Sequence, residues 1–200
     1  KLIVSVYGNH YKIGAKITGI HNIYNIMAAI GACIANNISI QMIIKSIENI
    51  KNIPGRMEFI GSEKNKVFVD YAHTPDAYQN ILKIIEEIKN KKDKIITLFG
   101  CGGDRDRNKR PVMAKISEQY SDRIIVTTDN PRTENIDNII NDILCGFKFE
   151  KHIVIKDREK AIIESIRMMD EKSILIVLGK GRENYQLINK EKKYHNDIEI

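Results

Sequence analysis

Residues 123–132 read Arg-Ile-Ile-Val-Thr-Thr-Asp-Asn-Pro-Arg, an apolar run that gives way to a polar loop. The run is short and rich in Ile and Val, which is typical of a β-strand buried on both faces. The loop presents the carboxylate of Asp129, the amide of Asn130 and the guanidinium of Arg132, and Pro131 stiffens it. An arginine binds a carboxylate through two parallel hydrogen bonds, which a lysine cannot do. We therefore expect this loop to bind a zwitterion.

Three other apolar runs end in polar loops in the same way. They are residues 66–69 before Asp-Tyr-Ala-His-Thr-Pro (70–75), residues 94–99 before Gly-Cys-Gly-Gly-Asp-Arg-Asp (100–106), and residues 173–178 before Gly-Lys-Gly-Arg-Glu-Asn-Tyr-Gln (179–186). Helical patterns fill the gaps between the runs: Thr74 can cap a helix that starts at Pro75, and further helices are expected at 111–119, 134–145 and 158–169. This alternation predicts an α/β domain with a doubly wound, mostly parallel sheet. All four loops would then meet at the carboxyl ends of the strands.

The first quarter of the chain has a different pattern. We expect strands at 2–6 and 11–18 and helices within 22–50. This stretch holds too little apolar surface to fold well alone, so we expect it to be the tail of a domain whose body precedes Lys1. Residues 51–55, Lys-Asn-Ile-Pro-Gly, are the expected hinge, because Pro and Gly end the helical pattern. The predicted domains are therefore residues 1–53 and 54–200.

Composition limits the classes of function. The chain has 200 residues, a formal charge of +6 and 29% charged residues, and no apolar run has the length of a membrane span. The lysines are scattered, which favours nucleotide bias of the genome over nucleic-acid binding. Cys33, Cys101 and Cys145 make neither a disulfide framework nor a zinc site, and the five histidines lack metal-ligand spacing.

These observations predict where the protein acts and what it does not bind. The cysteines fit a reducing cytosol and no secretory leader is visible, so we expect a cytoplasmic protein. We expect no metal site in this chain, no nucleic-acid or membrane partner and no obligate protein partner. The chain opens with Lys1 rather than Met, and we take it to be a fragment or a processed piece.

Five ordered motifs resemble the Mur ligases that add the third residue of the peptidoglycan stem peptide. They are Pro-Gly-Arg-Met-Glu (54–58), Val-Asp-Tyr-Ala-His-Thr-Pro-Asp-Ala (69–77), Phe-Gly-Cys-Gly-Gly-Asp-Arg-Asp (99–106) with Lys-Arg-Pro (109–111) and Met113, Thr-Asp-Asn-Pro-Arg-Thr-Glu (128–134), and Gly-Lys-Gly (179–181) with Glu-Asn-Tyr-Gln (183–186). Residues 19–29 also resemble the end of the family's central ATP-binding domain. The resemblance implies that residues 1–53 are the remnant of that domain and residues 54–200 the Rossmann-like carboxyl-terminal domain.

The resemblance also implies a reaction. ATP, with Mg²⁺, phosphorylates the terminal carboxylate of UDP-N-acetylmuramoyl-L-alanyl-D-glutamate, and an incoming amine attacks the acyl phosphate to form an amide. Family members bind the ATP phosphates with a glycine-rich loop, and no Gly-x-x-x-x-Gly-Lys-[Ser/Thr] occurs in this sequence. The UDP-binding domain is missing as well. We therefore expect this polypeptide alone to be inactive, and we assign no catalytic residue in it.

The amino-acid site, by the same resemblance, lies within this chain. In family members with Asp-Asn-Pro-Arg the substrate is meso-diaminopimelate, and the matching contacts fall on Arg105, Asp129, Asn130, Pro131, Arg132, Gly179 and Glu183. Arg132 with Asn130 would bind the distal carboxylate, and Glu183 would bind the distal ammonium. L-Lysine lacks that carboxylate, so its binding would leave Arg132 desolvated and unpaired.

The resemblance gives the ATP side a smaller share of this chain. Asn25 would face the adenine, Arg56 would lie near the phosphates, and Asp70 would face the ribose or phosphate end. Tyr71 and His73 would line the site.

Three features depart from the family pattern. Arg182 stands where the last motif carries a histidine, and we expect it to add charge beside Glu183. Ile20-His21 replaces a phenylalanine that is common in this branch, and the chain stops at Ile200, short of a final helix.

Three other functions stay open. One is the same ligase chemistry with L-lysine as the added amino acid. Another is a stand-alone module that binds a diamino acid without activating it. A third is a structural α/β domain whose basic surface binds an acidic partner.

Overall fold

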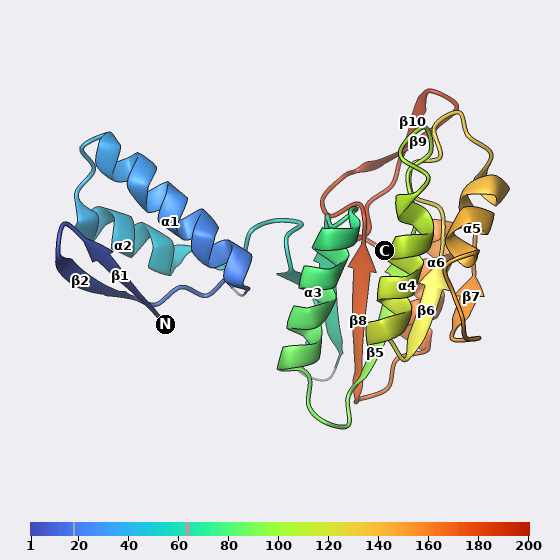
Figure 1. Ribbon diagram of the computed structural model, residues 1–200, viewed down its shortest axis with the longest axis horizontal. Helices are drawn as coiled ribbons and strands as arrows, with labels where there is room; N and C mark the ends of the chain where they lie inside the picture. Colours follow the sequence, from blue (N-terminus) through green and yellow to red (C-terminus); the bar gives the residue numbers. More distant parts are fainter. Residues whose placement is uncertain (18, 63–64) are drawn as a thin grey trace. The chain divides into compact units, whose positions relative to one another are not determined.

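The chain folds into two compact units, Lys1–Ile53 and Pro54–Ile200. The computed structural model describes residues 1–17, 19–62 and 65–200, with the side chain of residue 21 left out (Figure 1). None of the helices in these described ranges is long and apolar enough to cross a membrane.

The first unit is a β-hairpin with two helices. Strand β1 (Leu2–Val6) pairs antiparallel with β2 (Asn9–Ile13), and helices α1 (Ile20–Ala35) and α2 (Ile40–Asn49) follow. Five isoleucines form its small core: Ile13, Ile26, Ile30, Ile43 and Ile47.

The second strand predicted in this unit, residues 11–18, is wrong in its bounds. Tyr7 and Gly8 both have positive φ and form a two-residue turn, which pairs Val6 with Asn9. This register brings Leu2, the first residue of β1, opposite Ile13, so the strand ends there. Residue 18, the last of the predicted strand, lies outside the described residues.

The second unit is built on a six-stranded sheet. Its order is β3 (Glu58–Phe59), β4 (Lys66–Asp70), β8 (Ser173–Leu178), β5 (Lys94–Phe99), β6 (Arg123–Val126) and β7 (His152–Val154). Every neighbouring pair is parallel except β3 with β4. The α/β class and the mostly parallel sheet predicted from the sequence are confirmed.

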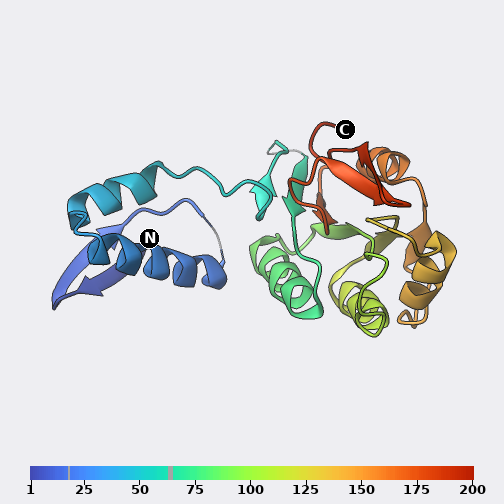
Figure 2. The ribbon, with the colours of Figure 1, turned by 90° about the horizontal axis from the view of Figure 1, so that it is seen from above.

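Helices cover both faces of this sheet. Figure 2 shows α3 (Pro75–Ile88), α4 (Lys109–Tyr120) and α5 (Ile136–Leu144) on one face, with α6 (Arg158–Arg167) on the other. The larger core cluster joins the first three helices to the sheet, and the smaller one joins α6 to it through Ala161 and Ile162. Thr74 caps α3 as predicted, because its hydroxyl accepts the N–H of Ala77 at 3.3 Å.

A second hairpin follows the sheet and was not predicted. It consists of β9 (Tyr185–Ile188) and β10 (Glu191–Tyr194), which pair antiparallel. The sequence Glu-Lys-Lys-Tyr of β10 is exposed throughout and carries no apolar signal. Arg132 forms a bridge with Ile188, so this hairpin lies beside the loop that follows β6.

The strand order gathers the predicted loops at one edge. Strand β8, the last of the parallel strands in the sequence, lies between β4 and β5. The loops after β4, β5, β6 and β8 therefore leave neighbouring strands in the same direction. In doubly wound sheets, ligands bind at the carboxyl ends of the strands where the strand order reverses, which is where these loops meet.

Candidate functional site

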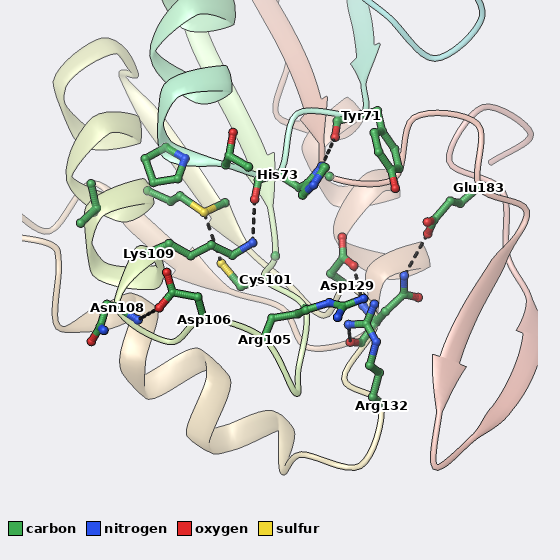
Figure 3. A pocket seen from close by; sticks show the side chains of 18 residues that line it. Tyr71, His73, Cys101, Arg105, Asp106, Asn108, Lys109, Asp129, Arg132 and Glu183 are labelled. Atoms are coloured by element: carbon green, nitrogen blue, oxygen red, sulfur yellow. Dashed lines mark hydrogen bonds between the residues drawn. The ribbon is translucent and has the colours of Figure 1, made fainter.

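A pocket of about 810 Å³ opens at the carboxyl ends of these strands (Figure 3). Six of the seven residues predicted for the amino-acid site line it: Arg105, Asp129, Asn130, Arg132, Gly179 and Glu183. The seventh, Pro131, lines a neighbouring pocket of about 460 Å³ instead. Residues as far apart in the sequence as Arg105 and Glu183 thus meet in one cavity, because the loops that carry them follow neighbouring strands.

The amide of Asn130 is held from both ends. Its Oδ1 accepts hydrogen bonds from the Nζ of Lys180 at 3.1 Å and from the backbone N–H of Leu187 at 2.9 Å. Its Nδ2 donates to Oε2 of Glu183 at 2.9 Å. An amide nitrogen carries two hydrogens, so one N–H of Asn130 is left for a ligand.

Arg132 has a left-handed backbone, with φ of 53°. Two hydrogen bonds to the β9–β10 hairpin hold it there, from its N–H to the carbonyl of Leu187 (2.9 Å) and from the N–H of Asn189 to its own carbonyl (2.8 Å). Its Nη1 donates to the carbonyl of Gly103 at 2.8 Å. Its Nη2 and Nε donate to none of the described residues, which leaves one side of the guanidinium for a carboxylate.

A second guanidinium, that of Arg105, points into the pocket from the loop after β5 (Figure 3). The loop is fixed through Asp104, whose Oδ2 accepts the N–H (3.0 Å) and the hydroxyl (2.8 Å) of Thr133. The backbone hydrogen bond from Thr133 is the main cause that lowers the pKa of Asp104 below its usual range. Two cationic side chains from different strands thus face one pocket.

A buried arginine, Arg110, also holds the loop after β5 in place. The side chain of Arg110 is fully buried and bonds Glu134 at 2.6 Å and Asp142 at 2.7 Å. Its Nη2 also donates to the carbonyl of Gly102 at 3.1 Å. Hydrogen bonding to Arg110 lowers the pKa of Glu134 below its usual range.

Glu183 is held by a buried cation. Its Oε2 accepts from the Nζ of Lys180 at 3.0 Å, and the side chain of Lys180 is 0% exposed. The expectation that Arg182 adds charge beside Glu183 is wrong. Arg182 forms a bidentate pair with Glu58 instead, at 2.7 and 3.1 Å. Glu58 also accepts the backbone N–H of Gly55, at 2.6 Å.

The far side of the pocket is formed by the loop after β4 and the start of α4. Tyr71 and His73, which were predicted to line the ATP side, line this pocket. The Nδ1 of His73 lies 2.9 Å from the carbonyl of Tyr71, and Lys109 donates to the carbonyl of His73 at 2.8 Å. Cys101 is buried here, and burial raises the pKa of its thiol to about 12, which excludes it as a nucleophile at neutral pH.

Comparison with known proteins decides the family. The family model described as "Mur ligase, glutamate ligase domain" matches residues 55–181. The chain belongs to the Mur ligase family. A UDP-N-acetylmuramoyl-L-alanyl-D-glutamate--2,6-diaminopimelate ligase from Fusobacterium nucleatum is 46% identical over 191 residues, which is 94% of this chain and 39% of the relative. One of the same name from Clostridium botulinum is 42% identical over 188 residues, with 92% and 38% covered.

Solved structures of Mur ligases agree with the fold. The structure of a UDP-N-acetylmuramoyl-L-alanyl-D-glutamate--2,6-diaminopimelate ligase superposes with a TM-score of 0.70 at 33% identity, covering 96% of this chain and 39% of that one. A pseudomurein peptide ligase type C from Methanothermus fervidus has a TM-score of 0.71 at 22% identity, over 90% and 37% of the two chains, and shows the shared fold. This chain spans about two fifths of the length of the curated relatives named above.

Within the second unit, neither Asp70 nor Arg56, both predicted for ATP, lines the pocket. Asp70 is buried, and its carboxylate accepts the backbone N–H groups of Met57 and Ala72, each at 2.6 Å. The guanidinium of Arg56 lies 4.7 Å from the ring centroid of Tyr71. In the first unit, Asn25 is exposed on α1 and donates to Asn22 at 3.3 Å. Their contacts with ATP stay predictions.

Two residues of the Mur ligase site were missed in the sequence. Lys180 lies between two glycines just after a strand. This Gly-Lys-Gly sequence is too short for a phosphate loop and by itself indicates no other contact. Gln186 donates to the carbonyls of Thr128 (3.3 Å) and Asp129 (3.0 Å), so it fixes the loop from the hairpin. Two of these contacts join distant positions, because Asn130 is 50 residues from Lys180 and Thr128 is 58 residues from Gln186. The contact from Lys180 to Glu183 spans only three residues.

Proposed function

We propose that the protein containing this chain is an ATP-dependent ligase that adds meso-2,6-diaminopimelate to UDP-N-acetylmuramoyl-L-alanyl-D-glutamate in peptidoglycan synthesis. The observation that carries the proposal is the charge pattern of one pocket. Two guanidiniums, those of Arg105 and Arg132, face the same cavity as the carboxylates of Asp129 and Glu183. Its relatives from Fusobacterium nucleatum and Clostridium botulinum carry the name of this activity.

The pocket suits the far end of diaminopimelate, which bears one carboxylate and one ammonium. The carboxylate would bind the open side of the Arg132 guanidinium, with Arg105 and the remaining N–H of Asn130 beside it. The ammonium would bind Glu183, whose Oε1 receives no hydrogen bond from the described residues. This holds the amino acid by the end that does not react and leaves its other amine to point out of the domain.

The reaction then needs little covalent chemistry from this domain. The amine of diaminopimelate attacks the acyl phosphate of the muramoyl dipeptide, so a C–N bond forms, a C–O bond breaks, and phosphate and a proton leave. The domain contributes binding and orientation of the amine, which lowers the entropic part of the barrier. ATP is the phosphoryl donor, and we propose that it and Mg²⁺ bind mainly to a central domain of which residues 1–53 are the end.

Three further statements follow from this proposal. The chain by itself is inactive, because its sequence has no glycine-rich loop for the ATP phosphates. Mg²⁺ is bound mostly by parts of the complete protein outside this chain. The complete enzyme acts in the cytoplasm on small-molecule substrates.

Lysine is the main alternative substrate, and Arg132 discriminates against it. Lysine carries the distal ammonium but no distal carboxylate. Its binding would desolvate the guanidinium of Arg132 without a partner, which costs about 1–3 kcal/mol or more for a charged group. The enzyme should therefore prefer diaminopimelate strongly.

Arg132→Ala in the complete protein tests the proposal. We expect diaminopimelate-dependent phosphate release to lose about 100-fold in kcat/KM, and the preference over lysine to fall by a similar factor. Arg167→Ala is the control, because Arg167 is a 71% exposed arginine on α6 that pairs only with Glu164 among the described residues. Unchanged turnover and preference in Arg132→Ala would refute the assignment. Diaminopimelate binding by the native gene product without any phosphate release would instead support a stand-alone binding module.

A further inference from the structure

A buried charged side chain contacts two of the residues that line the pocket, and the proposed function does not use it. The side chain of Lys180 is 0% exposed and makes three contacts from its Nζ. It lies 3.1 Å from Asn130 Oδ1, 3.0 Å from Glu183 Oε2 and 5.6 Å from the ring centroid of Tyr185. A buried ammonium is unfavourable unless it is paired and hydrogen-bonded, so this arrangement has to be specific.

The backbone on both sides directs Lys180 inward. Gly179 and Gly181 have φ of 112° and 54°, values that side-chain-bearing residues rarely adopt. A Cβ on Gly179 would lie 2.6 Å from Asp129 Oδ2, and one on Gly181 would lie 2.8 Å from the carbonyl oxygen of Gly55. The Gly-Lys-Gly sequence is therefore a tight turn, and its lysine side chain is buried against Asn130 and Glu183.

Lys180 decides which way the amide of Asn130 faces. Lysine and the backbone N–H of Leu187 are both donors, so only the oxygen of the amide can face them. The amide nitrogen is then directed at Glu183 and the pocket. Without Lys180, one of the two donors that fix this orientation is gone.

Lys180 also orients Glu183. Two donors, Lys180 Nζ and Asn130 Nδ2, anchor Oε2. Within the described residues, none donates to Oε1, and the side chain is 22% exposed toward the pocket. The carboxylate thus has one anchored oxygen and one presented to a ligand.

We propose that Lys180 is a positioning residue for diaminopimelate, acting through Asn130 and Glu183 without touching the substrate. The inference rests on the proposed function, because it assumes that these two side chains meet the far end of that amino acid. It assigns to the lysine of the Gly-Lys-Gly turn the role of setting specificity between diaminopimelate and lysine.

The test compares Lys180→Met with the wild-type complete protein. We expect KM for diaminopimelate to rise at least tenfold, calorimetric binding of diaminopimelate to weaken by the same factor, and the preference over lysine to fall. KM for ATP and for the muramoyl dipeptide should stay within about twofold. A merely structural role would lower stability and activity with all substrates and leave the preference unchanged.

Two further variants make the test specific. Lys192→Met is the matched control, because Lys192 also lies over the Tyr185 ring, at 4.3 Å, but on an exposed strand outside the pocket. In the double variant Lys180→Met with Glu183→Gln, the loss in the free energy of diaminopimelate binding should be smaller than the sum of the losses in the two single variants. The reason is that the lysine acts through the glutamate.

Each outcome decides the matter. If the wild-type protein neither binds nor turns over diaminopimelate, the proposed function fails and this inference with it. If the wild type is active and Lys180→Met keeps its KM and its preference, only the inference is overturned. If Lys180→Met does not fold, Lys180→Gln, which keeps a donor, takes its place. Failure of both to fold would assign Lys180 to stability and overturn the proposal.

Discussion

Two buried cations in this domain have opposite surroundings. The side chains of Arg158 and Lys180 are both 0% exposed and each is paired with a carboxylate, at 2.7 and 3.0 Å. The partner of Arg158, Asp197, is itself 0% exposed, while the partner of Lys180, Glu183, is 22% exposed and lines the pocket. The closed pair can only stabilise the fold, whereas the open pair presents one carboxylate oxygen to a ligand.

The closed pair joins three segments that are distant in the sequence. Arg158 at the start of α6 donates to both carboxylate oxygens of Asp197 and to the carbonyl of Leu178 at the end of β8. His195 Nε2 lies 2.8 Å from the same carboxylate. The pair thus fastens residues 195–200 to the sheet, and Ile198 and Ile200 pack on the smaller core cluster.

Asp197→Asn should give the largest effect on stability. It leaves the buried charge of Arg158 uncompensated, which typically costs about 3–5 kcal/mol of unfolding free energy. Urea unfolding measures the loss, and Glu164→Gln, in an exposed pair with Arg167, is the control with an expected change below about 1 kcal/mol. The folded fraction should bind diaminopimelate with unchanged affinity. A loss below about 1 kcal/mol would show that the closed pair is not a stability element.

Glu183→Gln should weaken diaminopimelate binding, which Asp197→Asn leaves unchanged, and should lower stability less than Asp197→Asn does. Calorimetry should show diaminopimelate binding weakened about tenfold or more, since the amide cannot neutralise the ammonium of the ligand. Unfolding free energy should also fall, because the buried ammonium of Lys180 loses its carboxylate partner. The fall should be smaller than in Asp197→Asn, because position 183 is 22% exposed and water from the pocket can reach it. Equal stability losses in the two variants would remove the distinction between open and closed pairs.

The pH dependence of stability should also test the closed pair of Arg158 and Asp197. The charge of Arg158 and the hydrogen bonds it donates hold the pKa of Asp197 well below its usual range, against the opposing effect of burial. Hydrogen bonds from arginines likewise lower the pKa of Glu58 and Glu134. A depressed folded-state pKa gives stability that is complete above the unfolded pKa of about 4 and is lost as the pH falls toward the folded value.

The wild-type protein should therefore lose stability progressively below about pH 4, and Asp197→Asn should flatten this acid limb. Unfolding by urea at pH values between 2 and 7 measures both curves. The same slope in variant and wild type would mean that Asp197 does not titrate with folding.

Much of the fold and of the candidate site could be predicted from local sequence patterns. The four apolar runs became β4, β5, β6 and β8, and the loop residues Arg105, Asn130 and Glu183 meet as expected. This works because the carboxyl ends of parallel strands lie at one edge, so local patterns suffice.

What the sequence did not reveal depends on distant partners. The pairing of Arg182 with Glu58 spans 124 positions, and that of Arg158 with Asp197 spans 39. The strands β3 and β7 have two and three residues, which is too short for a periodic signal. Asp70 accepts two backbone N–H groups, a contact that was not predicted from the sequence. The Asp-Tyr-Ala sequence permits such a turn, in which an aspartate accepts the N–H two residues on.

Arg182→His should have the smallest effect and is the most informative control for Lys180. Arg182 lies next to Glu183 in the sequence but is 55% exposed and pairs with Glu58, whose Oε2 keeps the N–H of Gly55 when the arginine is replaced. Diaminopimelate affinity should therefore stay within about twofold of the wild type. If Arg182→His weakened binding as much as Lys180→Met, the net charge near Glu183 would matter rather than the contact made by Lys180. If it leaves binding unchanged, then of the two cations within three positions of Glu183, only the buried one positions it.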